Sequence, residues 1–427
     1  MAGGETAIER ETGNETPGWL VSMIGSRQHY AVPRVFARTG GLRHFYTDAW
    51  YGRGRETLRR LGAAGRSMAG RYHPELAGVS ITAFNLGDLA WRFRKAQRRT
   101  GADRTSLYRF YHDFGRWYAS AVRDRVLRLG PDPKRHAFFG FNTGSLETVE
   151  ALRGRGVFTV VDQIDPARTE ERVIAEEVER WPGWESAPGR VPDSFFERLD
   201  REWAAADRVL VNSAWSADAL VEQGVDRRKV LTVPLAYEPT AVAAPPARPR
   251  PDGPLRVLWL GTVNLRKGIP YLIEAARRVA PSDAVFDIVG PLKISERAVA
   301  DAPSHVTFHG RATRDRADGF YRAADVFVLP TLSDGFAITQ LEAMAHGLPV
   351  ITTPRCGDVV RDGTDGRRVE AGSVDALVEA IEWFLNRRPQ LPELSEQARA
   401  RSRDFSLDAY GQRLDAELKR TAKHTTN

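Results

Sequence analysis

Residues 329–351, LPTLSDGFAITQLEAMAHGLPVI, decide how the surrounding chain folds. They follow an apolar run at 326–329 that predicts a strand, and the run ends at a proline-containing turn. The spacing of apolar residues then predicts a helix over about 338–346. Gly347 suits the left-handed residue that ends a helix, and a proline follows two residues later. A strand, a turn and a helix in this order indicate one unit of a parallel α/β sheet.

Two acids stand out in this stretch. Asp334 lies just outside the predicted helix N-terminus, and Glu342 lies one position from the apolar stripe of the helix. A half-buried carboxylate is costly unless it is hydrogen-bonded, and backbone amides at a helix start favour an anion. These features fit a ligand site. They fit equally well a capped helix in which Asp334 is an N-terminal charge and Glu342 forms a local ion pair.

The segment also resembles a known family signature. SDGFAITQLEAMAHGLPVI is similar to the E-x7-E segment of retaining glycosyltransferase family 4, whose members have the two-domain GT-B fold. The first acid is Asp334 here, where the family usually has Glu. The resemblance is firm over 255–385 and looser over the first half of the chain. The matching residues are Asp334, Gly335, Phe336, Glu342, Ala343, Met344, Ala345, Gly347, Pro349 and Val350.

Length and composition agree with a two-domain globular protein. The chain has 427 residues, of which 42% are hydrophobic and 27% are charged. Its net charge of +7 suits phosphorylated ligands or an anionic membrane and does not by itself indicate nucleic acid. A single cysteine excludes an intramolecular disulfide and a cysteine-cluster metal site. Without a signal peptide or an apolar run near 18 residues, we expect a cytoplasmic protein, with the inner face of the membrane as an alternative place.

The order of short apolar runs and helical patterns predicts two Rossmann-like, doubly wound domains that face each other across a cleft. We expect a disordered tail at 1–16 and an acceptor-side domain at 17–234. A proline-rich linker at 235–254 leads to a nucleotide-sugar-binding domain at 255–404. The resemblance implies that the final segment, 405–427, is a helix that crosses back to the first domain.

Arg266 and Lys267 are candidate phosphate ligands. They follow the first predicted strand of the second domain, where the topology places them in the cleft. Arg offers a planar fork and Lys a mobile point charge, a combination that suits a diphosphate, although a solvated basic turn has the same pattern. The resemblance favours the first interpretation, because Lys267 and Gly268 fall on the family's phosphate-binding Lys-Gly. The family's usual Arg is replaced by Thr262, and we expect Arg266 to substitute for it.

The resemblance implies further donor contacts. Glu342 would hold the ribose hydroxyls, Asp334 the donor-sugar hydroxyls, and Arg311 would lie near the nucleobase. Asp162 falls where the family often has a histidine that contacts the donor sugar. With Asp165, it also leaves a divalent metal as an alternative, although two carboxylates three residues apart are a weak signal. The remaining candidate donor-binding residues are Gly25, at the end of the first strand, and the backbone of Gly335, Phe336 and Ala337.

We therefore expect a retaining hexosyltransferase that moves a sugar from a nucleotide-diphosphate-sugar donor to an unidentified acceptor. Catalysis would rest on Arg266, Lys267 and Asp334, without a metal or other cofactor. The acceptor would be a small molecule, a lipid-linked compound or a polysaccharide; peripheral membrane contact is an alternative and nucleic acid is not expected. A nucleotide-sugar epimerase, a sugar phosphorylase and a catalytically inactive nucleotide-sugar-binding protein remain alternatives, because a fold does not determine a reaction.

Overall fold

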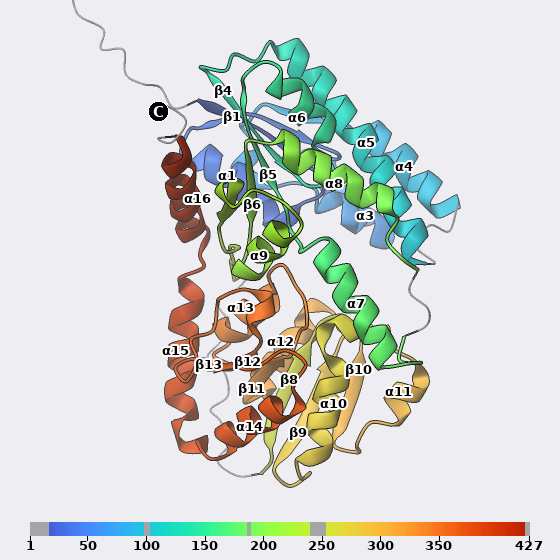
Figure 1. The fold of residues 1–427 in the computed structure, drawn as a ribbon, viewed down its shortest axis with the longest axis vertical. Coiled ribbons are helices and arrows are strands. Elements are labelled where there is room, and N and C mark those ends of the chain that lie inside the picture. Colours follow the sequence, from blue (N-terminus) through green and yellow to red (C-terminus); the bar gives the residue numbers. More distant parts are fainter. Residues whose placement is uncertain (1–16, 98–102, 186–188, 240–252, 423–427) are drawn as a thin grey trace, which may run out of the picture.

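The computed structural model describes residues 17–97, 103–185, 189–239 and 253–422, which form two α/β domains stacked end to end (Figure 1). The predicted tail at 1–16 and most of the predicted linker at 235–254 lie outside the described residues. Each domain contains one sheet in which every strand pairs in parallel with its neighbours. The predicted fold class, two Rossmann-like domains of the GT-B type, is confirmed.

The first domain has a seven-stranded sheet in the order β3-β2-β1-β4-β5-β6-β7. Its central strands β1, β4, β5 and β6 are mostly apolar and buried on both faces, as parallel strands covered by helices must be. The strands are β1 Gly18–Met23, β2 Leu42–Thr47, β3 Ile81–Ala83, β4 His136–Phe141, β5 Phe158–Asp162, β6 Arg208–Val211 and β7 Val230–Thr232. The helices are α1 Ala31–Arg38, α2 Arg55–Arg59, α3 Gly62–Ala69, α4 Asn85–Gln97, α5 Arg104–Leu129, α6 Leu146–Arg153, α7 Arg168–Arg180, α8 Asp193–Ala205 and α9 Ala214–Glu222.

The second domain repeats this topology in a six-stranded sheet, β10-β9-β8-β11-β12-β13. A short 3₁₀ helix, Leu265–Lys267, precedes its first α-helix. The strands are β8 Leu255–Leu260, β9 Ala284–Val289, β10 Val306–Gly310, β11 Val326–Leu329, β12 Val350–Thr352 and β13 Gly366–Arg368. The helices are α10 Ile269–Arg278, α11 Glu296–Ala300, α12 Arg314–Ala323, α13 Ile338–Ala345, α14 Val374–Leu385, α15 Leu391–Arg403 and α16 Leu407–Ala422.

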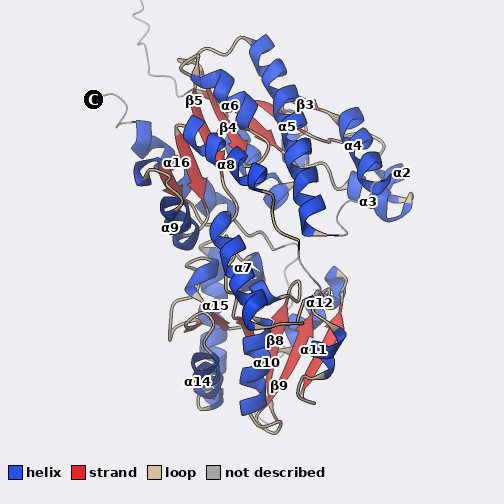
Figure 2. Cartoon of the chain, turned by 45° about the vertical axis from the view of Figure 1, so that its right-hand side comes forward, coloured by secondary structure: helices blue, strands red, loops and turns tan. Residues whose placement is uncertain are grey.

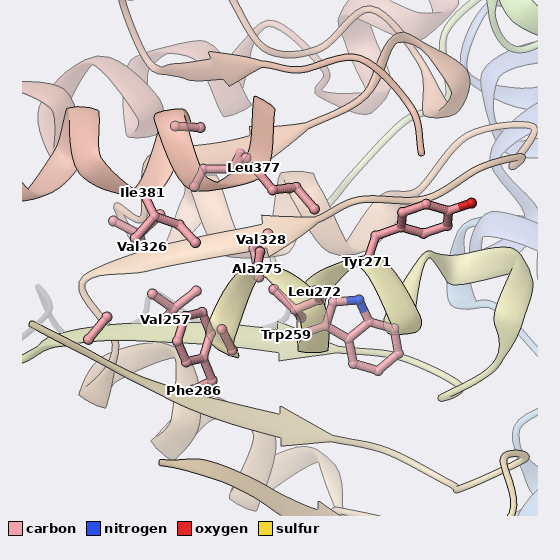
Figure 3. Packing of buried hydrophobic residues seen from close by; sticks show 14 of the residues in the cluster. Val257, Trp259, Tyr271, Leu272, Ala275, Phe286, Val326, Val328, Leu377 and Ile381 are labelled. Carbon is pink, nitrogen blue, oxygen red and sulfur yellow. The ribbon is translucent and has the colours of Figure 1, made fainter. Parts of the chain in front are cut away.

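The core of the second domain holds β8 and β11 in place, the two strands whose ends carry the candidate site. Trp259 of β8 and Phe286 of β9 are fully buried and pack with Leu272 of α10 and Leu377 of α14 in one hydrophobic cluster (Figure 3). Such close packing leaves the strand ends little freedom, so the loops that follow them are held on a rigid base.

Two helices tie the domains together (Figure 1). Helix α7 follows a strand of the first domain but packs on the second, where Val173 joins the hydrophobic cluster and the Tyr271 hydroxyl donates to Glu177 at 2.8 Å. Helix α16 ends the chain against the first domain. Its apolar stripe, Leu407, Tyr410 and Leu414, joins the cluster that contains β1 and α1. Among the described residues, no helix is long and apolar enough to cross a membrane.

Candidate active site

The site is built where each sheet reverses its strand order. In the first domain this switch point lies between β1 and β4, and in the second between β8 and β11. Parallel sheets bind ligands in the crevice beyond the carboxyl ends of the strands at such points, because loops diverge there to opposite faces. The loops at both switch points carry charged side chains, and in the second domain Arg266 contacts Glu170, which belongs to the helix after β5 of the first domain.

Lys267 and Asp334 close the second switch point. Lys267 follows β8, Asp334 follows β11, and the ammonium group donates to the carboxylate. The Asn264 side chain accepts from the Lys267 amide at 3.1 Å and so caps the short helix that carries the lysine. Gly268 then has φ +71°, and a Cβ atom there would lie 1.9 Å from the Pro330 carbonyl oxygen. The glycine lets the lysine turn approach the loop that carries Asp334.

Arg266 lies beside this pair, with three oxygen groups around its guanidinium. It donates to the Ser333 carbonyl at 2.9 Å and to the Glu170 carboxylate at 3.0 Å, and Asp334 lies 3.7 Å away. Although burial opposes ionisation of Asp334, Lys267 and Arg266 hold the pKa of its carboxyl below its ordinary value. The structure therefore brings Arg266, Lys267 and Asp334, all predicted from the sequence, into one cluster of alternating charge.

Glu170 is the member of this cluster that the sequence analysis missed. It belongs to the first turn of α7, and its side chain is 15% exposed. Burial is the main reason that its pKa is raised to about 7, opposed by Arg266 and reinforced by the neighbouring acids Asp165 and Asp334. The only sequence signal for Glu170 as a site residue was its position just beyond a strand end and a proline. Its contact with Arg266 could not be predicted, because the two residues are 96 positions apart.

The first switch point has a similar pairing of loops. Arg27 follows β1 and donates to the Asn142 side chain, which follows β4, at 2.9 Å. The three residues after Arg27, from Gln28 to Tyr30, all have left-handed φ values between 47° and 64°. Non-glycine residues adopt this conformation only when surrounding contacts impose it, and functional sites often contain such strain. The sequence analysis did not identify Arg27.

Asp162 ends β5 next to this loop and is 2% exposed. Burial raises the pKa of its carboxyl to about 7, and Arg27 only partly opposes the shift. The Asp165 carboxylate accepts from the Gln163 side chain and the Ala167 amide, each at 3.0 Å. Within the described ranges, no three His, Cys, Asp or Glu side chains are grouped so that they could hold a metal ion.

The turn before α13 differs from the expectation of three outward amides. The Ala337 amide donates to the Cys356 carbonyl at 3.1 Å and is therefore already engaged within the domain. The Phe336 ring is buried and packs near Phe405, so only its backbone faces the loop. A Cβ atom at Gly335 would lie 1.9 Å from the Ile164 carbonyl oxygen of the first domain. At this glycine the backbone of the other domain therefore makes a close approach.

The other predicted donor residues lie apart from the charge cluster. Glu342 on α13 is half-buried and accepts from the Tyr321 hydroxyl at 3.0 Å. This bond supplies the partner that a half-buried carboxylate in this helix requires. Arg311 follows β10 and is exposed. The Gly25 amide donates to Asp48 at 2.9 Å within the first domain.

Comparison with known structures defines the class. Over 96% of this chain and all of the other, the fold matches sucrose-phosphate synthase from Thermosynechococcus elongatus, with a TM-score of 0.63 and 18% identity. Over 95% of this chain and all of the other, it matches Anabaena HepE with a TM-score of 0.57 and 13% identity, in a crystal structure with UDP. These likenesses are structural, and they place the chain among proteins with the GT-B fold.

The family follows from sequence comparison. Residues 254–387 match the family model of glycosyl transferases group 1, which confirms the resemblance predicted from the sequence over this part of the chain. Among curated relatives, a D-inositol 3-phosphate glycosyltransferase of Nocardia farcinica is 30% identical over 48% of this chain and 50% of its own length. The chain spans about half the length of the curated relatives it matches, between 44% and 59% for the first three.

Proposed function

We propose that the protein is a glycosyltransferase that moves a sugar from a nucleotide-diphosphate-sugar donor to an acceptor hydroxyl with retention of configuration. One observation carries the proposal. Two cations, Arg266 and Lys267, lie together against Asp334 at the switch point of the second domain, and they are the only cations in contact with Asp334 among the described residues. This switch point lies within the region that matches the model of glycosyl transferases group 1. A diphosphate needs such paired cations, and the relation to HepE, solved with UDP, supports this class of donor.

The chemistry follows from where charge develops. As the sugar leaves, negative charge grows on the diphosphate oxygens, and preorganised cations stabilise it. Lys267 and Arg266 are held in place by Asp334, Glu170 and the Ser333 carbonyl. In a retaining reaction on the face from which the diphosphate departs, a phosphate oxygen takes the acceptor proton. In this mechanism neither a basic side chain nor a divalent metal is required, and Asp334 would hold the sugar hydroxyls.

The decisive experiment is turnover of Lys267→Ala. We expect a loss of about 3 kcal/mol of transition-state stabilisation, which is a hundredfold or more in kcat/KM. Nucleoside diphosphate release from UDP-, GDP- and ADP-sugars measures the reaction, and proton NMR of the product reports the anomeric configuration. Lys419→Ala is the matched control, since this lysine is 66% exposed on α16 and pairs with Asp415 far from the site. Unchanged turnover by a folded Lys267→Ala protein would show that Lys267 does not stabilise the leaving diphosphate.

A further inference from the structure

Helix α4 lies on the first domain with its apolar side turned to solvent. Leu86, Leu89 and Phe93 are 85%, 40% and 63% exposed, and Ala90 between them is exposed as well. These four residues stand at i, i+3, i+4 and i+7 and therefore form a single stripe along the helix. A surface helix of a globular domain normally turns such a stripe toward the core. We call this stripe the α4 face.

Specific contacts on the opposite side hold α4 in this orientation. Trp91 packs against Phe110 and Phe114 of α5, with ring centroids 5.8 Å apart in both pairs. Asp88, which is 3% exposed, pairs with Arg92 one turn along the same helix. The Asp88 carboxylate is thus turned inward and the apolar residues outward, and rotating the helix to bury the α4 face would break the contacts of Trp91 with α5.

The surroundings of the α4 face are basic. Residues 53–97 contain nine Arg and Lys against three Asp and Glu, an excess of six out of the seven net positive charges of the whole chain. This segment therefore carries a local excess of positive charge. Helices α2 and α3, which carry several of the arginines, lie beside α4 (Figure 2). Arg59, Arg60, Arg66 and Arg94 are exposed.

We propose that the α4 face and its surrounding arginines bind the surface of an anionic lipid bilayer. Thirteen residues make a helix about 20 Å long, too short to span the hydrocarbon core but suited to lie in the plane of the interface. Phe93 and Leu86 would enter the boundary between headgroups and acyl chains, and the arginines would meet lipid phosphates. A second copy of the chain is disfavoured as the partner, because a two-fold symmetric interface would bring the arginines of one copy against the same arginines of the other.

This inference rests on the surface alone and is independent of the proposed reaction. Its test is co-sedimentation of the full chain with vesicles containing phosphatidylglycerol and with vesicles of phosphatidylcholine alone. We expect binding to the anionic vesicles that weakens with added salt, and at least tenfold weaker binding by the Leu86→Ser/Phe93→Ser double variant. Removing one charge by Arg94→Gln should weaken binding about fivefold. Leu129→Ser, 48% exposed at the end of α5, should bind like the wild type.

Three results would overturn the proposal. The first is a wild-type protein that stays in the supernatant with both kinds of vesicle. The second is a double variant that sediments with anionic vesicles as well as the wild type does. The third is a concentration-dependent dimer in light scattering that the double variant abolishes, which would assign the α4 face to a second copy of the chain. Circular dichroism shows whether the variants are folded, and nucleotide-dependent thermal shift shows that the distant site is intact.

Discussion

Glu170→Gln should strengthen donor binding, although it removes a hydrogen-bonded partner of Arg266. The wild-type carboxylate accepts from the Arg266 guanidinium at 3.0 Å, and a diphosphate must compete with it for that cation. Burial has already raised the pKa of Glu170 to about 7. Adding phosphate charge beside it raises the cost of its own negative charge further, so binding should be accompanied by uptake of a proton at Glu170.

The magnitude follows from this pKa. If binding requires the neutral acid, protonating a group of pKa about 7 costs about 1.4 kcal/mol for each pH unit above 7, which is tenfold in affinity. At about pH 8 we therefore expect Glu170→Gln to bind the donor about tenfold more tightly than the wild type, and at about pH 6 equally well. Asp162 also has a pKa of about 7, so the informative quantity is the difference between the two proteins and not the slope of either.

The assay is isothermal titration with a nucleotide-diphosphate sugar, chosen by thermal-shift screening, because its phosphates do not titrate between pH 6 and pH 8. Repeating it in buffers of different ionisation enthalpy counts the proton directly. Glu176→Gln is the control, since this residue lies on the same helix with its side chain 59% exposed. Equal affinities of wild type and Glu170→Gln at about pH 8, or weaker binding by the variant, would refute the reasoning.

The same carboxyl affects stability, and three further predictions concern the site. The pKa of Glu170 in the folded protein lies above its unfolded value of 4.5, so this residue makes the fold less stable as pH rises from about 4.5 through about 7. Glu170→Gln should remove this pH dependence, which amounts to up to about 3 kcal/mol in the free energy of unfolding measured by urea titration. Turnover should persist in excess EDTA. A complete loss of turnover that magnesium or manganese restores would instead indicate a metal site with Asp162 and Asp165 as ligands. Asp334→Asn should mainly lower kcat and Glu342→Gln should mainly raise KM, and the reverse pattern in steady-state kinetics would exchange their roles. Gly335→Ala should lower kcat/KM at least tenfold, because its Cβ atom would meet the Ile164 carbonyl of the other domain, whereas Gly319→Ala, with open space around it, should leave kcat/KM unchanged.

Much of the fold could be predicted from local pattern. The apolar run at 326–329 coincides with β11, and the helix predicted over about 338–346 coincides with α13 to within one residue. Short or charged helices such as α2, α8 and α11 give no clear sequence signal, because their apolar positions are too few to show a period without the packing that stabilises them.

Predictions of the site divide in the same way. Arg266, Lys267 and Asp334 were singled out because each follows a predicted strand, where parallel sheets bind ligands, and because the family resemblance favoured a ligand site there. The state of the Ala337 and Gly25 amides was not predictable, because their acceptors, Cys356 and Asp48, lie on other loops.

What the sequence determined by itself is the succession of strands and helices and the chemistry of the loops that follow them. These depend on the spacing of apolar residues and on backbone preferences, which act over a few neighbouring positions. Tertiary structure alone decided that Glu170 contacts Arg266 and that α4 turns Phe93 outward. A helical period shows which residues share a face but not what covers it. That choice depends on contacts between distant segments, such as α7 on the second domain and Trp91 on α5.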